Sequence, residues 1–198
     1  MTKSSFTLNR AKYQPKLPAL FKKAGLQIEA KPVVKTTKSV ANAAEIKKLF
    51  PHIYGKPTLT FAKAKKASKK AFNVGVVLSG GQAPGGHNVV SGILDGIKAS
   101  SPKSNLIGFL GGPSGLIENK FVNLTPAFVK DYRNTGGFDI IGSGRTKLET
   151  EEQFESALST MQAHKLDALV IVGGDDSNTN ACMLAEYIAA HNSPMRKD

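Results

Sequence analysis

The sequence is poor in cysteine and in aromatic residues, and it holds no long apolar run. Its 198 residues include one cysteine, Cys182, and no tryptophan. A single cysteine excludes an internal disulfide framework and predicts a cytoplasmic protein, because thiols stay reduced in that compartment. No stretch approaches the roughly 18 to 20 consecutive apolar residues that a membrane helix needs, so we predict no membrane span. Residues 1–10 also lack the apolar segment of a secretory leader.

Positive charge is concentrated in the first third of the chain. Residues 1–72 carry 17 lysines and arginines against two acidic residues, Glu29 and Glu45. Residues 73–198 carry 10 basic against 13 acidic residues, so the formal net charge of +12 comes from the N-terminal part. A basic segment can hold phosphates or an acidic partner. Few aromatic residues stand among these lysines and no nucleic-acid-binding motif accompanies them, so we predict no nucleic-acid partner.

The sequence divides into a basic N-terminal extension, residues 1–72, and a domain of alternating strands and helices, residues 73–198. Within the extension, residues 1–41 mix lysine, proline and scattered apolar residues, which predicts an irregular segment. Residues 43–50 predict a short helix. Residues 62–71 hold too many lysines to pack, and they predict an exposed helix or a linker.

Short apolar runs in the domain alternate with segments of helical periodicity. The runs predict strands at residues 74–78, 106–110, 139–141 and 169–172. Apolar residues recur at helical spacing over residues 90–97, 126–132, 154–161 and 181–188. Thr150 with Gln153 three residues later forms a capping box, which marks a helix start. This alternation predicts an α/β fold, a doubly wound, Rossmann-like parallel sheet.

The glycine-rich loops that follow the predicted strands should converge on one edge of the sheet, because right-handed crossovers place every strand-to-helix loop there. These loops cover residues 79–86, 111–115, 142–145 and 173–177. Glycine lets backbone N–H groups approach a phosphate, and the following helix adds its positive end. The first loop is neither a Walker loop nor a regular dinucleotide fingerprint, and a tight turn alone would also explain its glycines.

Two charged side chains in these loops suit phosphate chemistry. Asp175 offers hard oxygen ligands to Mg²⁺, and Arg145 offers several donors to a phosphoryl group. A solvated helix cap and a surface arginine are the alternative interpretations. An acid for a metal and a base for phosphate on one edge of a sheet indicate phosphoryl transfer. We interpret Cys182 as a packing residue and His87 as a neutral residue near a helix start.

Three motifs resemble those of the pyrophosphate-dependent phosphofructokinases. Residues 76–88, VVLSGGQAPGGHN, resemble the phosphate loop of that family, and residues 142–147, GSGRTK, resemble its arginine loop. Residues 173–180, GGDDSNTN, are the most specific match, because two adjacent acids at this place mark the pyrophosphate users. Residues 13–18 and 50–57 resemble the N-terminal extension of the long form. The likeness covers the chain from about Arg10 to Ala190.

The resemblance implies a Mg²⁺-dependent, reversible transfer of phosphate from pyrophosphate to the 1-hydroxyl of fructose 6-phosphate, a step of glycolysis and gluconeogenesis. It implies that Asp175 helps to hold Mg²⁺ and that Asp176 sets donor specificity, since its charge would repel the α-phosphate of a nucleotide. It also implies an oligomer of like or unlike subunits. The residues expected to bind pyrophosphate are Gly80, Gly81, Arg145 and Ser177.

The chain departs from the family pattern after the helix predicted at residues 181–188. Family members continue into a Thr-Ile-Asp-x-Asp motif whose first Asp is the catalytic base, and no such motif occurs here. We therefore expect an N-terminal fragment that lacks the base and the sugar-phosphate site and is inactive alone. A different enzyme with a Gly-Gly-Asp loop, such as a lipid or NAD kinase, is one alternative. A truncated, non-catalytic pyrophosphate-binding module or partner subunit is another.

Overall fold

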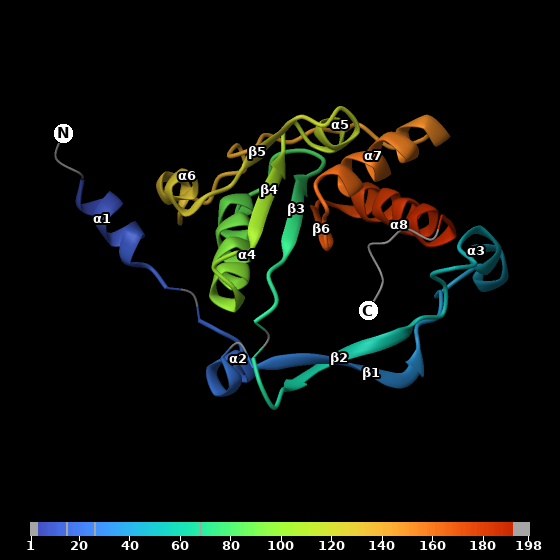
Figure 1. The fold of residues 1–198 in the computed structure, drawn as a ribbon, viewed down its shortest axis with the longest axis horizontal. Coiled ribbons are helices and arrows are strands. Elements are labelled where there is room, and N and C mark those ends of the chain that lie inside the picture. Colours follow the sequence, from blue (N-terminus) through green and yellow to red (C-terminus); the bar gives the residue numbers. More distant parts are fainter. Residues whose placement is uncertain (1–3, 15, 26, 68, 192–198) are drawn as a thin grey trace.

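The chain forms a four-stranded sheet with helices on both faces and a separate two-stranded ribbon (Figure 1). In this computed structural model, residues 4–14, 16–25, 27–67 and 69–191 are described. The sheet has the order β5-β4-β3-β6, in which β3, β4 and β6 are parallel and β5 is antiparallel to β4. Its strands are β3 (Asn73–Leu78), β4 (Asn105–Phe109), β5 (Phe121–Asn123) and β6 (Ala168–Val172).

Apolar side chains of the central strand β3 alternate between two hydrophobic clusters, one on each face of the sheet. Val74, Val76 and Leu78 join the first cluster with residues of α4 and α6, whereas Val77 joins the second with residues of α5, α7 and α8. The predicted α/β fold with a parallel sheet is thereby confirmed. The helices are α4 (Gly86–Ser100), α5 (Pro113–Ile117), α6 (Pro126–Val129), the 3₁₀ turn η1 (Lys130–Tyr132), α7 (Glu151–Ala163) and α8 (Asp175–Ala190).

Residues 139–141, predicted as a strand, form an irregular segment instead, in which Asp139 is exposed and the two isoleucines are buried. Ile140 and Ile141 are almost fully buried, which explains their apolar character. The N–H groups of Asp139 and Ile140 both donate to Nε2 of His87, each at 3.0 Å, so they are not available for a strand ladder. The prediction of a strand was wrong because an apolar run indicates burial and does not by itself indicate pairing. The short elements β5 and α5 were not predicted.

The extension contains more regular structure than its composition predicts. Its elements are α1 (Ser5–Lys12), α2 (Ala19–Ala24), β1 (Ile28–Thr36), α3 (Ala43–Leu49) and β2 (Pro57–Lys63). The helix expected at residues 43–50 is present as α3, but the irregular segment predicted for residues 1–41 was wrong. β1 pairs antiparallel with β2, for example Ile28 with Lys63. This pairing is not visible in the local sequence because the partner strand lies far along the chain.

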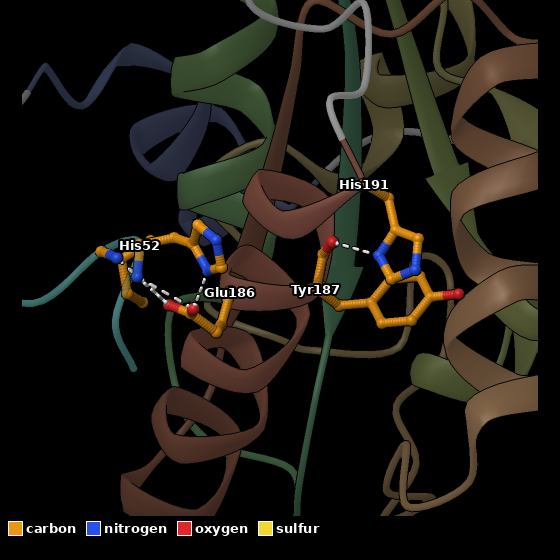
Figure 2. A network of polar contacts seen from close by, with 5 residues as sticks. His52, Glu186, Tyr187 and His191 are labelled. Carbon is orange, nitrogen blue, oxygen red and sulfur yellow. Dashed lines mark hydrogen bonds and ion pairs between the residues drawn. The ribbon is translucent and has the colours of Figure 1, made fainter. Parts of the chain in front are cut away.

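Side chains of the domain hold the extension by hydrogen bonds to its backbone, and the clearest cases are Glu186 and Asn134. The Glu186 carboxylate on α8 accepts from the N–H of His52, at 3.0 and 3.2 Å, and from that of Ile53, at 3.1 Å, and it also contacts Nδ1 of His52 (Figure 2). Burial opposes ionisation of Glu186, but the bonds from His52 and Ile53 outweigh it and hold its pKa below the usual value. The amide of Asn134 donates to the carbonyls of Arg10 and Tyr13, at 3.1 and 3.2 Å.

Candidate functional site

Three of the predicted loops meet around an open pocket of about 1000 Å³ at the carboxyl edge of the sheet. The first and the last are residues 79–86 after β3 and residues 173–177, whereas of the loop predicted at residues 142–145 only Arg145 lines the pocket, together with the next two residues. The fourth predicted loop, residues 111–115, does not line this pocket. It packs behind the third, where the N–H of Gly111 donates to Ile141 O at 2.8 Å and Gly112 approaches Gly144 so closely that a β-carbon would not fit.

Hydrogen bonds join the start of the first loop to its neighbours. Ser79 N–H donates to Val172 O at 2.8 Å, and the Ser177 hydroxyl donates to the Ser79 hydroxyl at 2.7 Å. Gly80 N–H donates to Gly144 O at 2.7 Å, in a backbone conformation with φ of +96° that favours glycine. The Gly80 N–H is therefore occupied. Gly81 is the next candidate for a phosphate contact, since its N–H makes no hydrogen bond within the described part of the chain.

The N-terminus of α8 opens into the pocket. Gly174 is the N-cap and no side chain caps the helix. The first hydrogen bond of this end runs from Asn178 N–H to Gly174 O, so in the described residues the N–H groups of Asp175, Asp176 and Ser177 have no partner. Unpaired N–H groups at the positive end of a helix dipole bind anions. The backbone alone therefore provides an anion site beside the predicted acids.

Two basic side chains reach the same pocket from residues 145–147. A β-carbon at Gly81 would lie 2.9 Å from Nη2 of Arg145, so the glycine leaves room for the guanidinium. Lys147 Nζ lies 3.4 Å from Asp176 Oδ2, and these side chains are 48% and 84% exposed. So exposed an ion pair is weak, and Lys147 remains available to a ligand. The sequence had assigned no role to Lys147, although residues two apart in an extended segment point the same way.

Asn180, the last residue of the motif at residues 173–180, is a second pocket residue to which the sequence had assigned no role. Its side-chain amide donates to Leu148 O at 2.8 Å, and its amide oxygen accepts from Leu148 N–H at 3.0 Å. These two bonds join α8 to the segment that follows Arg145 and Lys147. The partners lie 32 residues apart, so no local pattern could have revealed the contact.

The acids of the pocket suit a metal shared with a phosphate. Asp175 lines the pocket, and in the described part of the chain its carboxylate makes no ion pair. Mg²⁺ is usually held by one or two carboxylates together with water and substrate phosphates. No group of three or more His, Cys, Asp or Glu side chains that could hold a metal ion occurs among the described residues. Asp175 therefore fits Mg²⁺ that arrives with a phosphate ligand.

His87 does not line the pocket, but it follows the glycine loop directly and binds the segment at residues 139–140. Its ring is buried, with Nδ1 against the Thr135 hydroxyl and Nε2 accepting from the segment at residues 139–140. Burial lowers the pKa of His87, and this effect exceeds the opposing one of the Asp139 carboxylate, 2.9 Å from Nε2. Nε2 accepts from two backbone N–H groups, which suits a neutral ring whose proton is on Nδ1, toward the Thr135 hydroxyl. This agrees with the expected neutral residue, although its structural role is larger than a cap.

No helix in the described residues combines the length and the apolar character needed to cross a bilayer.

Comparisons with known proteins agree with the resemblance drawn from the motifs at residues 76–88, 142–147 and 173–180. The family model described as phosphofructokinase matches residues 73–193. The pyrophosphate–fructose 6-phosphate 1-phosphotransferase of Porphyromonas gingivalis is 52% identical over 191 residues, which is 96% of this chain and 34% of that protein. Subunit beta 2 of the same-named protein in Arabidopsis thaliana is 48% identical, over 89% of this chain and 31% of the relative. Subunit alpha of the same-named protein in Solanum tuberosum is 38% identical, over 91% of this chain and 30% of the relative.

Solved structures support the fold. A pyrophosphate-dependent phosphofructokinase from Nitrosospira multiformis matches 63% of this chain and 32% of its own, with a TM-score of 0.54 at 19% identity. The Pichia pastoris phosphofructokinase matches 64% of this chain and 14% of its own, with a TM-score of 0.50 at 25% identity. The chain spans about a third of the length of the curated relatives named above. The resemblance drawn from the three motifs is confirmed, and the chain belongs to the phosphofructokinase family.

Proposed function

We propose that this chain provides the phosphate-donor half of a pyrophosphate:fructose 6-phosphate 1-phosphotransferase. The observation that carries the proposal is the meeting of a helix N-terminus, Arg145, Lys147 and Asp175 around one pocket. Unpaired N–H groups and two cations suit the charge of pyrophosphate. The names of the relatives support this donor and this acceptor.

The roles of the residues follow from their positions. The N–H groups of Gly81 and of the first turn of α8 would bind pyrophosphate oxygens, with Arg145 and Lys147 neutralising charge as it moves toward the leaving phosphate. Asp175 would hold Mg²⁺, which supplies further charge neutralisation when bound. The Ser177 hydroxyl donates to Ser79 and would keep the glycine loop in place.

We infer that Asp176 selects pyrophosphate over ATP. Its carboxylate is exposed at the mouth of the pocket, one residue beyond Asp175, and it is balanced by Lys147. A nucleotide whose β- and γ-phosphates occupied the pyrophosphate positions would bring further negative charge toward it. A bound nucleotide would displace water from this exposed carboxylate and so strengthen the repulsion between the two negative charges. Pyrophosphate has no further phosphate and avoids that repulsion.

We further propose that the sugar-phosphate site and the catalytic base come from sequence outside these 198 residues. The sequence lacks the Thr-Ile-Asp-x-Asp motif, and the relatives are about three times as long. Relatives with alpha and beta subunits favour an oligomer of like or unlike chains. The unpaired thiol of Cys182 suits the cytoplasm.

Calorimetric titration of the chain with pyrophosphate, in the presence and absence of Mg²⁺, tests the proposal. We expect Mg²⁺-dependent binding that Arg145→Met weakens by about tenfold to a hundredfold, since a charge-assisted bond is lost. Arg133→Met is the matched control, because Arg133 pairs with Asp95 away from the pocket, at 2.8 and 2.6 Å. An equal loss in both variants, or no binding by the unchanged chain, would overturn the proposal.

Two further measurements separate the alternatives. ATP that binds as tightly as pyrophosphate would favour a different kinase, and Asp176→Gly should raise ATP affinity if the exclusion argument is right. No change in that variant would refute the argument. Incubation with fructose 6-phosphate and Mg²⁺-pyrophosphate should give no product. Binding without turnover also fits the second candidate, a non-catalytic pyrophosphate-binding or partner subunit, which co-purification with a full-length subunit would favour.

A further inference from the structure

Asn180 makes a paired contact that no other side chain around the pocket makes in the described part of the chain. Its amide both donates to and accepts from the backbone of a single residue, Leu148. The side chain of Leu148 is itself buried in the second hydrophobic cluster, together with Leu184 from α8. The Leu148 segment is therefore held to α8 by two polar bonds and by apolar packing.

The contact between Asn180 and Leu148 lies one turn of α8 away from the ion pair between Asp176 and Lys147. Asn180 is four residues after Asp176, so both side chains stand on the same face of α8, one turn apart. Their partners are consecutive: Asp176 meets Lys147, and Asn180 meets Leu148. The exposed ion pair is weak, whereas the half-buried amide pair fixes two backbone groups at once.

We propose that Asn180 is the positioning residue that sets the arginine loop against the anion-binding end of α8. The inference rests on the proposed function and deepens it: the Asn180 amide is taken up by the Leu148 backbone, and it thereby places Lys147, and through it Arg145, opposite the N–H groups of α8. The residue type follows from the geometry. A carboxamide offers an acceptor for Leu148 N–H and a donor for Leu148 O. A carboxylate has no donor, so it would place an oxygen against Leu148 O.

Asn178 provides a matched control on the same helix. Its amide donates to Gly174 O at 3.0 Å, one turn back, and makes no contact with the arginine loop. Asn178→Ala removes the same chemical group from the same helix without releasing residues 145–148. A difference between the two alanine variants therefore reports the Leu148 contact.

The first test is calorimetric titration with Mg²⁺-pyrophosphate of the full chain and of Asn180→Ala, Asn180→Asp and Asn178→Ala. We expect about a tenfold loss of affinity in both Asn180 variants, as for a lost hydrogen bond at a binding site, and little change in Asn178→Ala. Combined with Lys147→Met, Asn180→Ala should cost much less than it costs alone, because the cation that it positions is gone. Unchanged affinity, or full additivity of the two losses, would overturn the inference.

A second measurement is independent of the ligand. Amide hydrogen exchange should show that the Leu148 N–H loses protection in Asn180→Ala, which removes its acceptor, and keeps it in Asn178→Ala. Unchanged protection would overturn the inference. If the unchanged chain does not bind pyrophosphate, the proposed function fails and the role in phosphate binding fails with it, while lost protection at Leu148 would still establish that Asn180 holds the loop.

Discussion

The extension and the domain are held in place by different forces. In the described residues of the extension, Ala24 alone is buried, and large apolar side chains such as Phe61 and Leu59 stay exposed on β2. The domain has two apolar clusters that cover both faces of its sheet. We conclude that burial stabilises the domain, whereas the extension depends on backbone pairing and on a few polar contacts such as that of Glu186.

The largest contrast is expected from removing one aromatic ring in each region. Phe109 on β4 is fully buried, so Phe109→Ala should lower the free energy of unfolding by about 3–5 kcal/mol. Phe61 is 62% exposed, and Phe61→Ala should change the free energy of unfolding by less than about 0.5 kcal/mol. Urea denaturation of both variants measures the difference. Similar losses would show that the ribbon shares the cooperative core.

The next contrast is a pH dependence that belongs to the domain. His87 has a lowered pKa in the folded state because it is buried, so near and below its ordinary value of 6.5 the unfolded chain binds more protons than the folded one. Stability should therefore be full above that value and fall as the pH decreases below it. Urea midpoints at pH 7.5 and 5.5 in the chain and in His87→Leu test this, since the variant removes the titrating group.

The cost of that variant at pH 7.5 has a separate cause. Removing the ring leaves the buried N–H of Ile140 without its acceptor, at about 1–3 kcal/mol, whereas the N–H of the exposed Asp139 can bond to water. His191→Leu, at an exposed histidine, is the control and should leave the pH dependence unchanged. A His87→Leu variant with the same pH dependence as the unchanged chain would refute the assignment to His87.

A smaller contrast is expected from the two helix caps. The Thr150 hydroxyl accepts from Gln153 N–H in a complete capping box at the start of α7, so Thr150→Ala should cost about 1 kcal/mol. Ser4 caps α1 in the same way, by accepting from Thr7 N–H at 3.2 Å. Ser4→Ala should leave the global unfolding curve in place, because α1 lies outside the two clusters. An equal shift in both variants would mean that α1 unfolds with the domain.

The smallest effect on global stability, with a clear local one, is expected from Glu186→Gln. The amide accepts more weakly than the carboxylate at the N–H groups of His52 and Ile53. Limited trypsin digestion should then cleave after Lys47 and Lys48 severalfold faster, with the unfolding midpoint nearly unchanged. Glu155→Gln, an exposed acid on α7, is the control. Equal cleavage rates would show that the extension is held by other contacts.

The domain was more predictable from sequence than the extension, for a physical reason. β3 and β6 are short apolar runs because both of their faces pack, and α7 begins at a capping box contained in four residues. β1 depends on its partner β2, so its own lysine-rich sequence did not indicate a strand. The segment at residues 139–141 was predicted wrongly because a buried irregular segment and a paired strand can have the same short apolar sequence.

The candidate site was predictable in its loops and less so in its connections. Glycines and acids at strand ends indicated residues 79–86 and 173–177 because topology alone brings strand ends to one edge. The contacts of Lys147 and Asn180 join segments about 30 residues apart in the chain, and only the folded backbone brings them together.

The central position of β3 has a consequence for how the domain is made. β3 is the first strand of the sheet in sequence but pairs with the last, β6, and the Ser79–Ser177 bond that closes the pocket joins residues 98 positions apart. At a synthesis rate of about 5–20 residues per second, the glycine loop waits for roughly 5–20 s until the ribosome has made its partner. During that interval one apolar edge of β3 is open to chaperones or to neighbouring chains. The two loops that the Ser79–Ser177 bond joins are therefore made several seconds apart.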